Sequence, residues 1–154
     1  MNEKKLTFIC NNERKTVELA AKISKLCQQG DVFALYGTLG MGKSVFARAF
    51  IQNICGMTEV PSPTFTLVQM YDAPDFEIYH YDLYRLKSAE EIFELGIEEA
   101  MYEGVCLIEW PEKMGGYLPQ KAIKVEIKPK EQGRQIDILF NNEKVYQRFL
   151  SLKD

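Results

Sequence analysis

The chain has 154 residues, of which 46% are hydrophobic and 27% charged, and its formal net charge is −3. This length and composition predict a single domain over residues 1–154 and exclude a disordered or coiled-coil chain. The slight acidity argues against a protein that binds nucleic acid on its own, since such proteins usually carry a basic face. No apolar run reaches the ~18 residues of a membrane-spanning helix and no secretion signal is recognisable, so we expect a cytoplasmic protein without a membrane partner.

Strands and helices are predicted to alternate in the first third of the chain. A short strand at residues 6–10 precedes a helix whose apolar residues recur at helical spacing until Gly30. Residues 31–36 form an apolar run typical of a strand buried on both faces. A second helix is expected over residues 45–54, so the local order is strand, glycine-rich loop, helix.

The middle of the chain contains a proline-bounded loop at residues 61–63, where each proline disfavours helix. Residues 65–69 and 76–83 have the composition of two strands, and the turn-forming residues 72–75 join them as a hairpin. This part of the chain therefore predicts antiparallel pairing.

The remaining segments complete a mixed fold. A capping-box pattern at residues 88–91 predicts a helix, and residues 105–108 form another apolar core strand. Alternating residues at 123–127 and 136–140 indicate a hairpin at one sheet edge, followed by a short helix over 144–152. We expect an α/β protein with a three-layer P-loop NTPase-like fold and a mixed parallel/antiparallel central sheet.

The loop after the second strand matches G-x-x-x-x-G-K-[ST] at every fixed position, through Gly37, Thr38, Leu39, Gly40, Met41, Gly42, Lys43 and Ser44. Glycines let backbone N–H groups turn toward phosphate oxygens, and the helix N-terminus adds its positive dipole end. In such loops the lysine binds the β and γ phosphates and the hydroxyl binds Mg²⁺. The motif predicts a site for a nucleoside triphosphate with Mg²⁺.

A second magnesium residue is expected at the end of a neighbouring core strand. Glu109 directly follows the apolar residues 105–108 and is predicted to fill this role, although a strand-end carboxylate in solvent is the alternative. The adjacent Trp110 could pack over the site, anchor a partner or belong to the core.

Polar residues between the phosphate loop and Glu109 suggest segments that respond to the bound nucleotide. Ser62, Thr64 and Thr66 occupy the position of a switch segment, or serve turn formation alone. Asp82 could orient the attacking water, complete the metal shell or form a salt bridge with Arg85.

Other reactive residues give weaker signals. The four cysteines, Cys10, Cys27, Cys55 and Cys106, are far apart in the sequence and the chain has a single histidine, so we expect reduced thiols and no zinc site of the usual spacing. The glutamates within residues 90–103 form either a solvated face or a docking surface for a basic partner.

Four segments together resemble one known family. In sequence and in order along the chain, they are similar to motifs of the TsaE (YjeE) family of bacterial ATPases. The segments are the phosphate loop, Ser62-Pro63-Thr64-Phe65-Thr66, His80-Tyr81-Asp82-Leu83-Tyr84-Arg85 and Glu109-Trp110-Pro111-Glu112. The resemblance spans nearly the whole chain. It implies ATP hydrolysis in support of the TsaD and TsaB proteins, which make threonylcarbamoyladenosine in tRNA, with tRNA contacted only indirectly. It also implies phosphate and Mg²⁺ roles for Lys43 and Ser44, a metal role for Glu109 and a catalytic role for Asp82.

Two other functions are compatible with the motifs. A small-molecule kinase is one, although such kinases use arginine-bearing lids and the five arginines here form no cluster. A nucleotide-gated binding module without essential hydrolysis is the other. Asn11 and Arg134, near the ends of edge elements, are the candidates for contacts on the adenosine side.

Overall fold

The computed structural model describes residues 3–37, 42–56, 60 and 67–153. Within these ranges the strands are β1 (Lys4–Cys10), β2 (Val32–Tyr36), β3 (Val68–Asp72), β4 (Glu77–Asp82), β5 (Val105–Glu109), β6 (Ile123–Pro129) and β7 (Arg134–Phe140). The helices are α1 (Glu13–Leu26), α2 (Lys43–Cys55), α3 (Ile97–Glu103) and α4 (Glu143–Arg148), with 3₁₀ turns η1 (Ala89–Leu95), η2 (Pro111–Tyr117) and η3 (Leu150–Lys153). None of the helices in the described ranges is long and apolar enough to cross a membrane.

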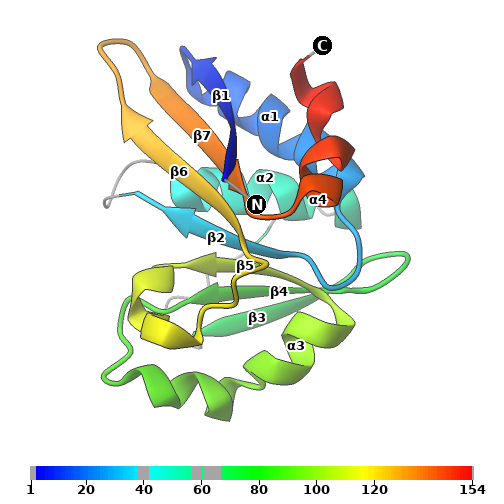
Figure 1. The fold of residues 1–154 in the computed structure, drawn as a ribbon, viewed down its shortest axis with the longest axis vertical. Coiled ribbons are helices and arrows are strands. Elements are labelled where there is room, and N and C mark those ends of the chain that lie inside the picture. The colour runs from blue at the N-terminus through cyan, green and yellow to red at the C-terminus, as the bar shows by residue number, and fades with distance from the viewer. Residues whose placement is uncertain (1–2, 38–41, 57–59, 61–66, 154) are drawn as a thin grey trace.

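The described strands form one seven-stranded sheet in the order β1-β7-β6-β2-β5-β4-β3 (Figure 1). The central pairs β6·β2, β2·β5 and β5·β4 are parallel, whereas β1·β7, β7·β6 and β4·β3 are antiparallel. The predicted mixed sheet is therefore confirmed. Its parallel centre brings the carboxyl ends of β2, β4 and β5 to one edge, where ligands of open α/β sheets usually bind.

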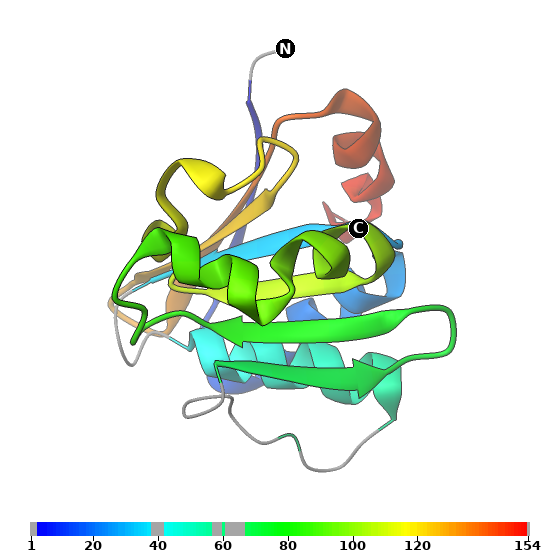
Figure 2. The ribbon, with the colours of Figure 1, turned by 90° about the horizontal axis from the view of Figure 1, so that it is seen from below.

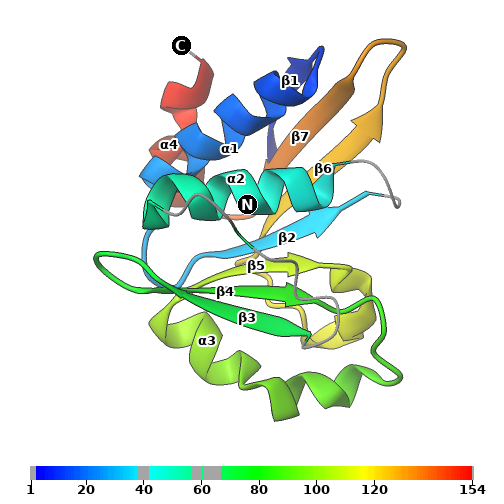
Figure 3. The same cartoon turned by 180° about the vertical axis from the view of Figure 1, so that it is seen from behind.

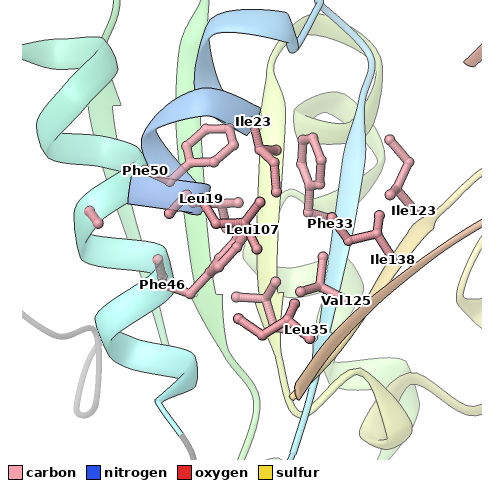
Figure 4. Close-up of a cluster of buried hydrophobic side chains, with 14 of the residues drawn as sticks. Leu19, Ile23, Phe33, Leu35, Phe46, Phe50, Leu107, Ile123, Val125 and Ile138 are labelled. Carbon is pink, nitrogen blue, oxygen red and sulfur yellow. The ribbon is translucent and has the colours of Figure 1, made fainter. Parts of the chain in front are cut away.

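Helices α1 and α2 cover one face of the sheet and enclose the larger core (Figure 3). Figure 4 shows Leu19 and Ile23 of α1 and Phe46 and Phe50 of α2 directed at Phe33 and other side chains of the sheet. The Phe33 and Phe50 rings meet edge to face with centroids 5.3 Å apart. Burying such large apolar side chains is the main favourable term in folding, and here it fixes α2 against β2.

The opposite face of the central strands is covered by η1, α3 and η2 (Figure 2). Val32 and Ala34 face this second core, whereas Phe33 and Leu35 face the first. Successive side chains of a strand point to opposite faces, so β2 is buried on both sides, as its apolar run predicts. The three-layer arrangement follows from these two cores.

The expected place of the β6–β7 hairpin at the sheet edge is wrong. Strand β1 pairs along the outer side of β7, with Leu6 opposite Ile138, so β1 and β3 are the edges of the described sheet. The alternation within β6 and β7 reports which face is buried. It carries no information about whether a further strand continues the hydrogen bonding.

The capping-box helix is also wrong in type. The segment is the 3₁₀ helix η1, and Ser88 caps it with its backbone carbonyl, which accepts from the Glu91 N–H at 3.2 Å, while its side chain makes no capping bond. Gly96, with φ +69°, ends the segment before an α-helix is established and leads into α3. The closing helix is likewise divided at Phe149 into α4 and η3.

All four cysteines are free thiols, as the sequence predicts. Burial raises the pKa of Cys27 and of Cys106 to about 12. Thiols protonated to this degree are poor nucleophiles at neutral pH.

Candidate phosphate- and magnesium-binding site

Gly42 sets the start of α2 and the direction of the phosphate loop. Its φ of +95° is a left-handed conformation that favours glycine, and its carbonyl accepts from the Phe46 N–H at 2.9 Å. Thr38, Leu39, Gly40 and Met41 lie outside the described residues, so their predicted contacts with phosphate stay predictions. The described part, strand β2 followed by Gly37 and then Gly42 at the head of α2, has the context that the motif requires.

Lys43 is a buried cation without a hydrogen-bond partner among the described residues. The residue is 5% exposed, and its Nζ makes no hydrogen bond within that part of the chain. Burial lowers the pKa of the Lys43 ammonium, and the nearby carboxylates of Glu109, Glu112 and Asp82 oppose that shift. A buried ammonium that makes no hydrogen bond is costly even with carboxylates nearby, so the arrangement favours an anion that would accept one.

Trp110 provides the surface on which Lys43 lies. The ammonium is 3.6 Å from the ring centroid, which is cation–π geometry, and the ring of Tyr84 packs on Trp110 with centroids 5.0 Å apart. Trp110 is half-buried and has φ +60° and ψ +50°, unusual for a residue other than glycine. Of the three possibilities for the lone tryptophan, the structure supports two together: the ring packs over Lys43, and it is a partly buried side chain of the second core.

Glu109 lies at the end of β5, beside the first turn of α2. It is 3% exposed, so it is no solvent-facing strand end. Its Oε1 accepts a hydrogen bond from the Ser44 hydroxyl at 3.2 Å. Mg²⁺ prefers oxygen ligands and usually takes one or two carboxylates together with phosphate, so this hydroxyl–carboxylate pair fits the metal predicted from the motif.

His80 is a site residue to which the sequence assigned no role. Its Nε2 lies 2.6 Å from Oε2 of Glu109, and both side chains are almost fully buried. The two residues are 29 positions apart and meet because β4 pairs in parallel with β5. Only the shared strand face of His80 and Asp82 hinted at this contact, since it places both on the side of the phosphate loop.

Asp82 is the residue of β4 paired with Glu109 of β5. Its Oδ1 accepts from the Tyr84 N–H at 3.1 Å, an Asx-type contact that orients the carboxylate. Burial, and after it the negative charge of Glu109, raises the pKa of Asp82, although the Tyr84 N–H opposes this. The predicted switch residues Ser62, Thr64 and Thr66 lie outside the described residues.

A pocket opens next to Gly42, between the N-terminal end of α1 and the β6–β7 turn. Its lining comprises Asn12, Glu13, Thr16, Gly42, Val45, Gly133 and Arg134. Arg134 therefore lines a pocket beside the phosphate loop, and its predicted contact on the adenosine side stays a prediction. Asn12, which caps α1 by accepting from the Lys15 N–H at 3.0 Å, lines the pocket, whereas the predicted Asn11 is exposed and outside this lining.

The strand–glycine loop–helix unit, with a buried lysine facing a serine–glutamate pair at the carboxyl edge of a parallel sheet, defines the class as a P-loop NTPase-like α/β protein. Comparison with known proteins specifies the family. Residues 10–136 match the model of the family described as "Threonylcarbamoyl adenosine biosynthesis protein TsaE". The chain belongs to the TsaE family.

Individual relatives agree with this assignment. The protein named tRNA threonylcarbamoyladenosine biosynthesis protein TsaE from Rickettsia felis is 42% identical over 88% of this chain and 80% of its own length. The protein of the same name from Bacillus subtilis is 35% identical over 81% of this chain and 78% of its own. Among solved structures, Bacillus subtilis YdiB superposes with a TM-score of 0.76 at 27% identity, covering 99% of this chain and 95% of that one.

Proposed function

We propose that this chain binds ATP with Mg²⁺ and hydrolyses it as an accessory ATPase of the TsaD and TsaB proteins, which make N6-threonylcarbamoyladenosine at position 37 of tRNAs. The family match and the names of the Rickettsia felis and Bacillus subtilis relatives support the place in tRNA modification. tRNA would be reached through the partner proteins, in keeping with the net charge of −3.

The observation that carries the proposal is the buried ammonium of Lys43, which forms no hydrogen bond with any described residue. It lies at the first position of α2, where the helix dipole also favours an anion. A triphosphate on this helix terminus would give the ammonium the hydrogen-bond acceptors that the described residues do not provide. Lys43 then binds the phosphates and stabilises the charge that develops on them during transfer.

The other site residues divide the remaining tasks. Ser44 and Glu109 hold Mg²⁺, which when bound neutralises phosphate charge. Asp82, beside Glu109 and held by the Tyr84 N–H, orients the attacking water. Arg134 and Asn12 contact the adenosine side from the pocket next to Gly42.

Hydrolysis by the isolated chain is expected to be slow. An arginine supplied in trans is worth about 10³ to 10⁵ in rate in related enzymes. The five arginines of this chain form no cluster in the sequence, so we expect a partner to supply the arginine. This favours an accessory ATPase over an independent kinase.

Turnover measurements test the proposal. Phosphate release is measured for the chain alone and with TsaB plus TsaD, and Glu109→Gln is the control because it is isosteric and uncharged. We expect the wild-type chain to release phosphate slowly alone and faster with the partners. In Glu109→Gln we expect neither the basal nor the stimulated release. Equal rates with and without partners, or full tRNA modification with Glu109→Gln, would contradict an essential, partner-dependent ATPase.

A further inference from the structure

The structure gives His80 a specific relationship to the magnesium residue. Its Nε2 and Oε2 of Glu109 are 2.6 Å apart, and the two residues are 1% and 3% exposed. A carboxylate that binds a metal ion can only accept hydrogen bonds, so in the proposed metal-binding role of Glu109 the imidazole Nε2–H is the donor. A bond this short and this buried fixes the carboxylate more firmly than a solvated contact would.

The two oxygens of Glu109 are thereby assigned different partners. Oε2 is taken by His80, and Oε1 faces Ser44, whose hydroxyl lies 3.2 Å away at the start of α2. Rotation of the carboxylate would break the bond to His80. One oxygen therefore stays directed at the phosphate-loop hydroxyl, on the side where a cation would be bound.

Packing alone does not account for a histidine here. The second ring nitrogen, Nδ1, is buried and has no hydrogen-bond partner among the residues that the structure describes. A buried polar atom without a partner destabilises a fold, and an apolar side chain of similar size would avoid that cost. The residue is thus poorly suited to the core and well suited to hold Glu109.

We propose that His80 is a positioning residue that orients Glu109 for Mg²⁺. It touches neither nucleotide nor metal but acts through the carboxylate, as the hydrogen-bond partners of metal ligands commonly do. This inference rests on the proposed function, because it assumes that Glu109 binds the metal.

The test compares two substitutions of similar size. In His80→Gln, the side-chain Nε2–H₂ group can take the place of the imidazole Nε2–H, whereas His80→Met fills the space without a donor. The affinity for a non-hydrolysable ATP analogue is measured calorimetrically with Mg²⁺ and with a chelator, and the ratio of the two affinities is the readout. Thermal melting of each variant checks that it folds.

We expect His80→Met to lower the magnesium-dependent gain in affinity by about 10- to 100-fold, the usual effect of losing the partner of a metal ligand, and His80→Gln to preserve it. In the double variant His80→Met/Glu109→Gln the ratio should equal that of Glu109→Gln alone, because both changes remove one interaction. Three results would overturn the proposal. They are an unchanged affinity ratio in His80→Met, additive reductions of the ratio in the double variant, and equal reductions in His80→Met and His80→Gln.

A second measurement does not depend on nucleotide binding. His80 is the only histidine, so its imidazole N–H resonance in an NMR spectrum needs no assignment by elimination. We expect a resonance protected from exchange in the nucleotide-free protein that shifts strongly in Glu109→Gln. If the wild-type chain bound no nucleotide while this shift appeared, the proposed function would fail and the hydrogen bond would stand. An unchanged resonance would sink the positioning role itself.

Discussion

The ammonium of Lys43 lies 3.6 Å from the centre of the Trp110 ring, and no group in the described part of the chain forms a hydrogen bond with it. Cation–π contacts are worth about 0.5 to 2 kcal/mol, less than a charge-assisted bond to phosphate is expected to provide. The ring therefore supports the lysine in the absence of an anion and should release it readily. This gives the lone tryptophan a direct connection to the phosphate site.

Binding of Mg·ATP should change the fluorescence of Trp110, because the cation over its ring is drawn toward phosphate. As the chain has one tryptophan, the signal has a single origin. Emission is recorded during titration of the wild-type chain and of Lys43→Met, which keeps the aliphatic length and removes the charge. A saturable change in Lys43→Met equal to that of the wild type would show that the lysine is not its source.

Asp82→Asn should abolish hydrolysis while making the nucleotide-free protein more stable at neutral pH. Because the pKa of Asp82 is raised in the folded state, folding favours its protonated form. Its contribution to stability is present at low pH and is lost as the pH rises through the folded pKa. The amide avoids that loss, so its advantage in melting temperature should appear at pH 7 and vanish below the ordinary pKa of aspartate.

Melting curves of the wild type and Asp82→Asn across this pH range, with phosphate-release assays at pH 7, check both halves of this prediction. Asp82→Asn should still bind Mg·ATP, since the residue is placed beside the metal pair and not in it. A variant that is less stable at neutral pH would refute the burial argument. Undiminished hydrolysis would remove Asp82 from catalysis.

Arg134→Ala should weaken the binding of ATP much more than that of inorganic tripolyphosphate. Arg134 lines the pocket beside Gly42, and its Nε is close enough to Gly42 that an added Cβ would lie 3.8 Å from it. Tripolyphosphate has no adenosine, so its affinity depends on the phosphate loop alone. The ratio of the affinities for ATP and tripolyphosphate therefore isolates the contribution of the adenosine side. Calorimetric titrations of Arg134→Ala and of the exposed Asn11→Ala measure it, and Asn11→Ala should behave as wild type.

The same loss for ATP and for tripolyphosphate would instead place Arg134 at the phosphates. A selective loss in Asn11→Ala would restore the sequence-based expectation for that residue.

Asp137 should make the sheet sensitive to acid. Burial alone would raise the pKa of Asp137, but hydrogen bonds from Lys128, Thr7 and Gln135 outweigh it and lower the pKa. The resulting stability is present above the unfolded pKa and is lost as the pH falls through the folded one. Asp137→Asn should lower the free energy of unfolding by about 1 to 3 kcal/mol at pH 7, the cost of impaired buried hydrogen bonding.

Urea unfolding at pH 7 and at about pH 3, below the ordinary aspartate pKa of about 3.9, measures the difference between wild type and Asp137→Asn. The difference should shrink at the lower pH. One that stayed constant would mean that the carboxylate charge contributes nothing.

Local patterns predicted the centre of the site because each of its parts is encoded in a short stretch of sequence. The apolar run of β2 and the glycines around Lys43 required no knowledge of distant residues, and Glu109 follows from the apolar run of β5. The same holds for α1 and α2, whose spacing and glycine stops are local. These features depend on backbone conformation and burial, both of which are encoded over a few residues.

The parts that could not be predicted depend on strand pairing. The contact of His80 with Glu109 requires the β4–β5 register, and the edge position of β1 requires its pairing with β7, more than a hundred residues away. Asn12, the N-cap of α1, lines the pocket beside Gly42, whereas Asn11 does not. Local patterns cannot distinguish these two neighbours, because the pocket is completed by the distant Gly133 and Arg134.

The most direct measurement of the central claim is a calorimetric titration of Mg·ATP into the wild-type chain and into Lys43→Ala, with melting curves to show that both are folded. We predict a saturable heat of association for the wild type and none for the variant, whose folded state should be retained because the ammonium forms no hydrogen bond with the described residues. Absence of heat with the wild type, or equal affinity in both, would contradict a triphosphate site built around Lys43.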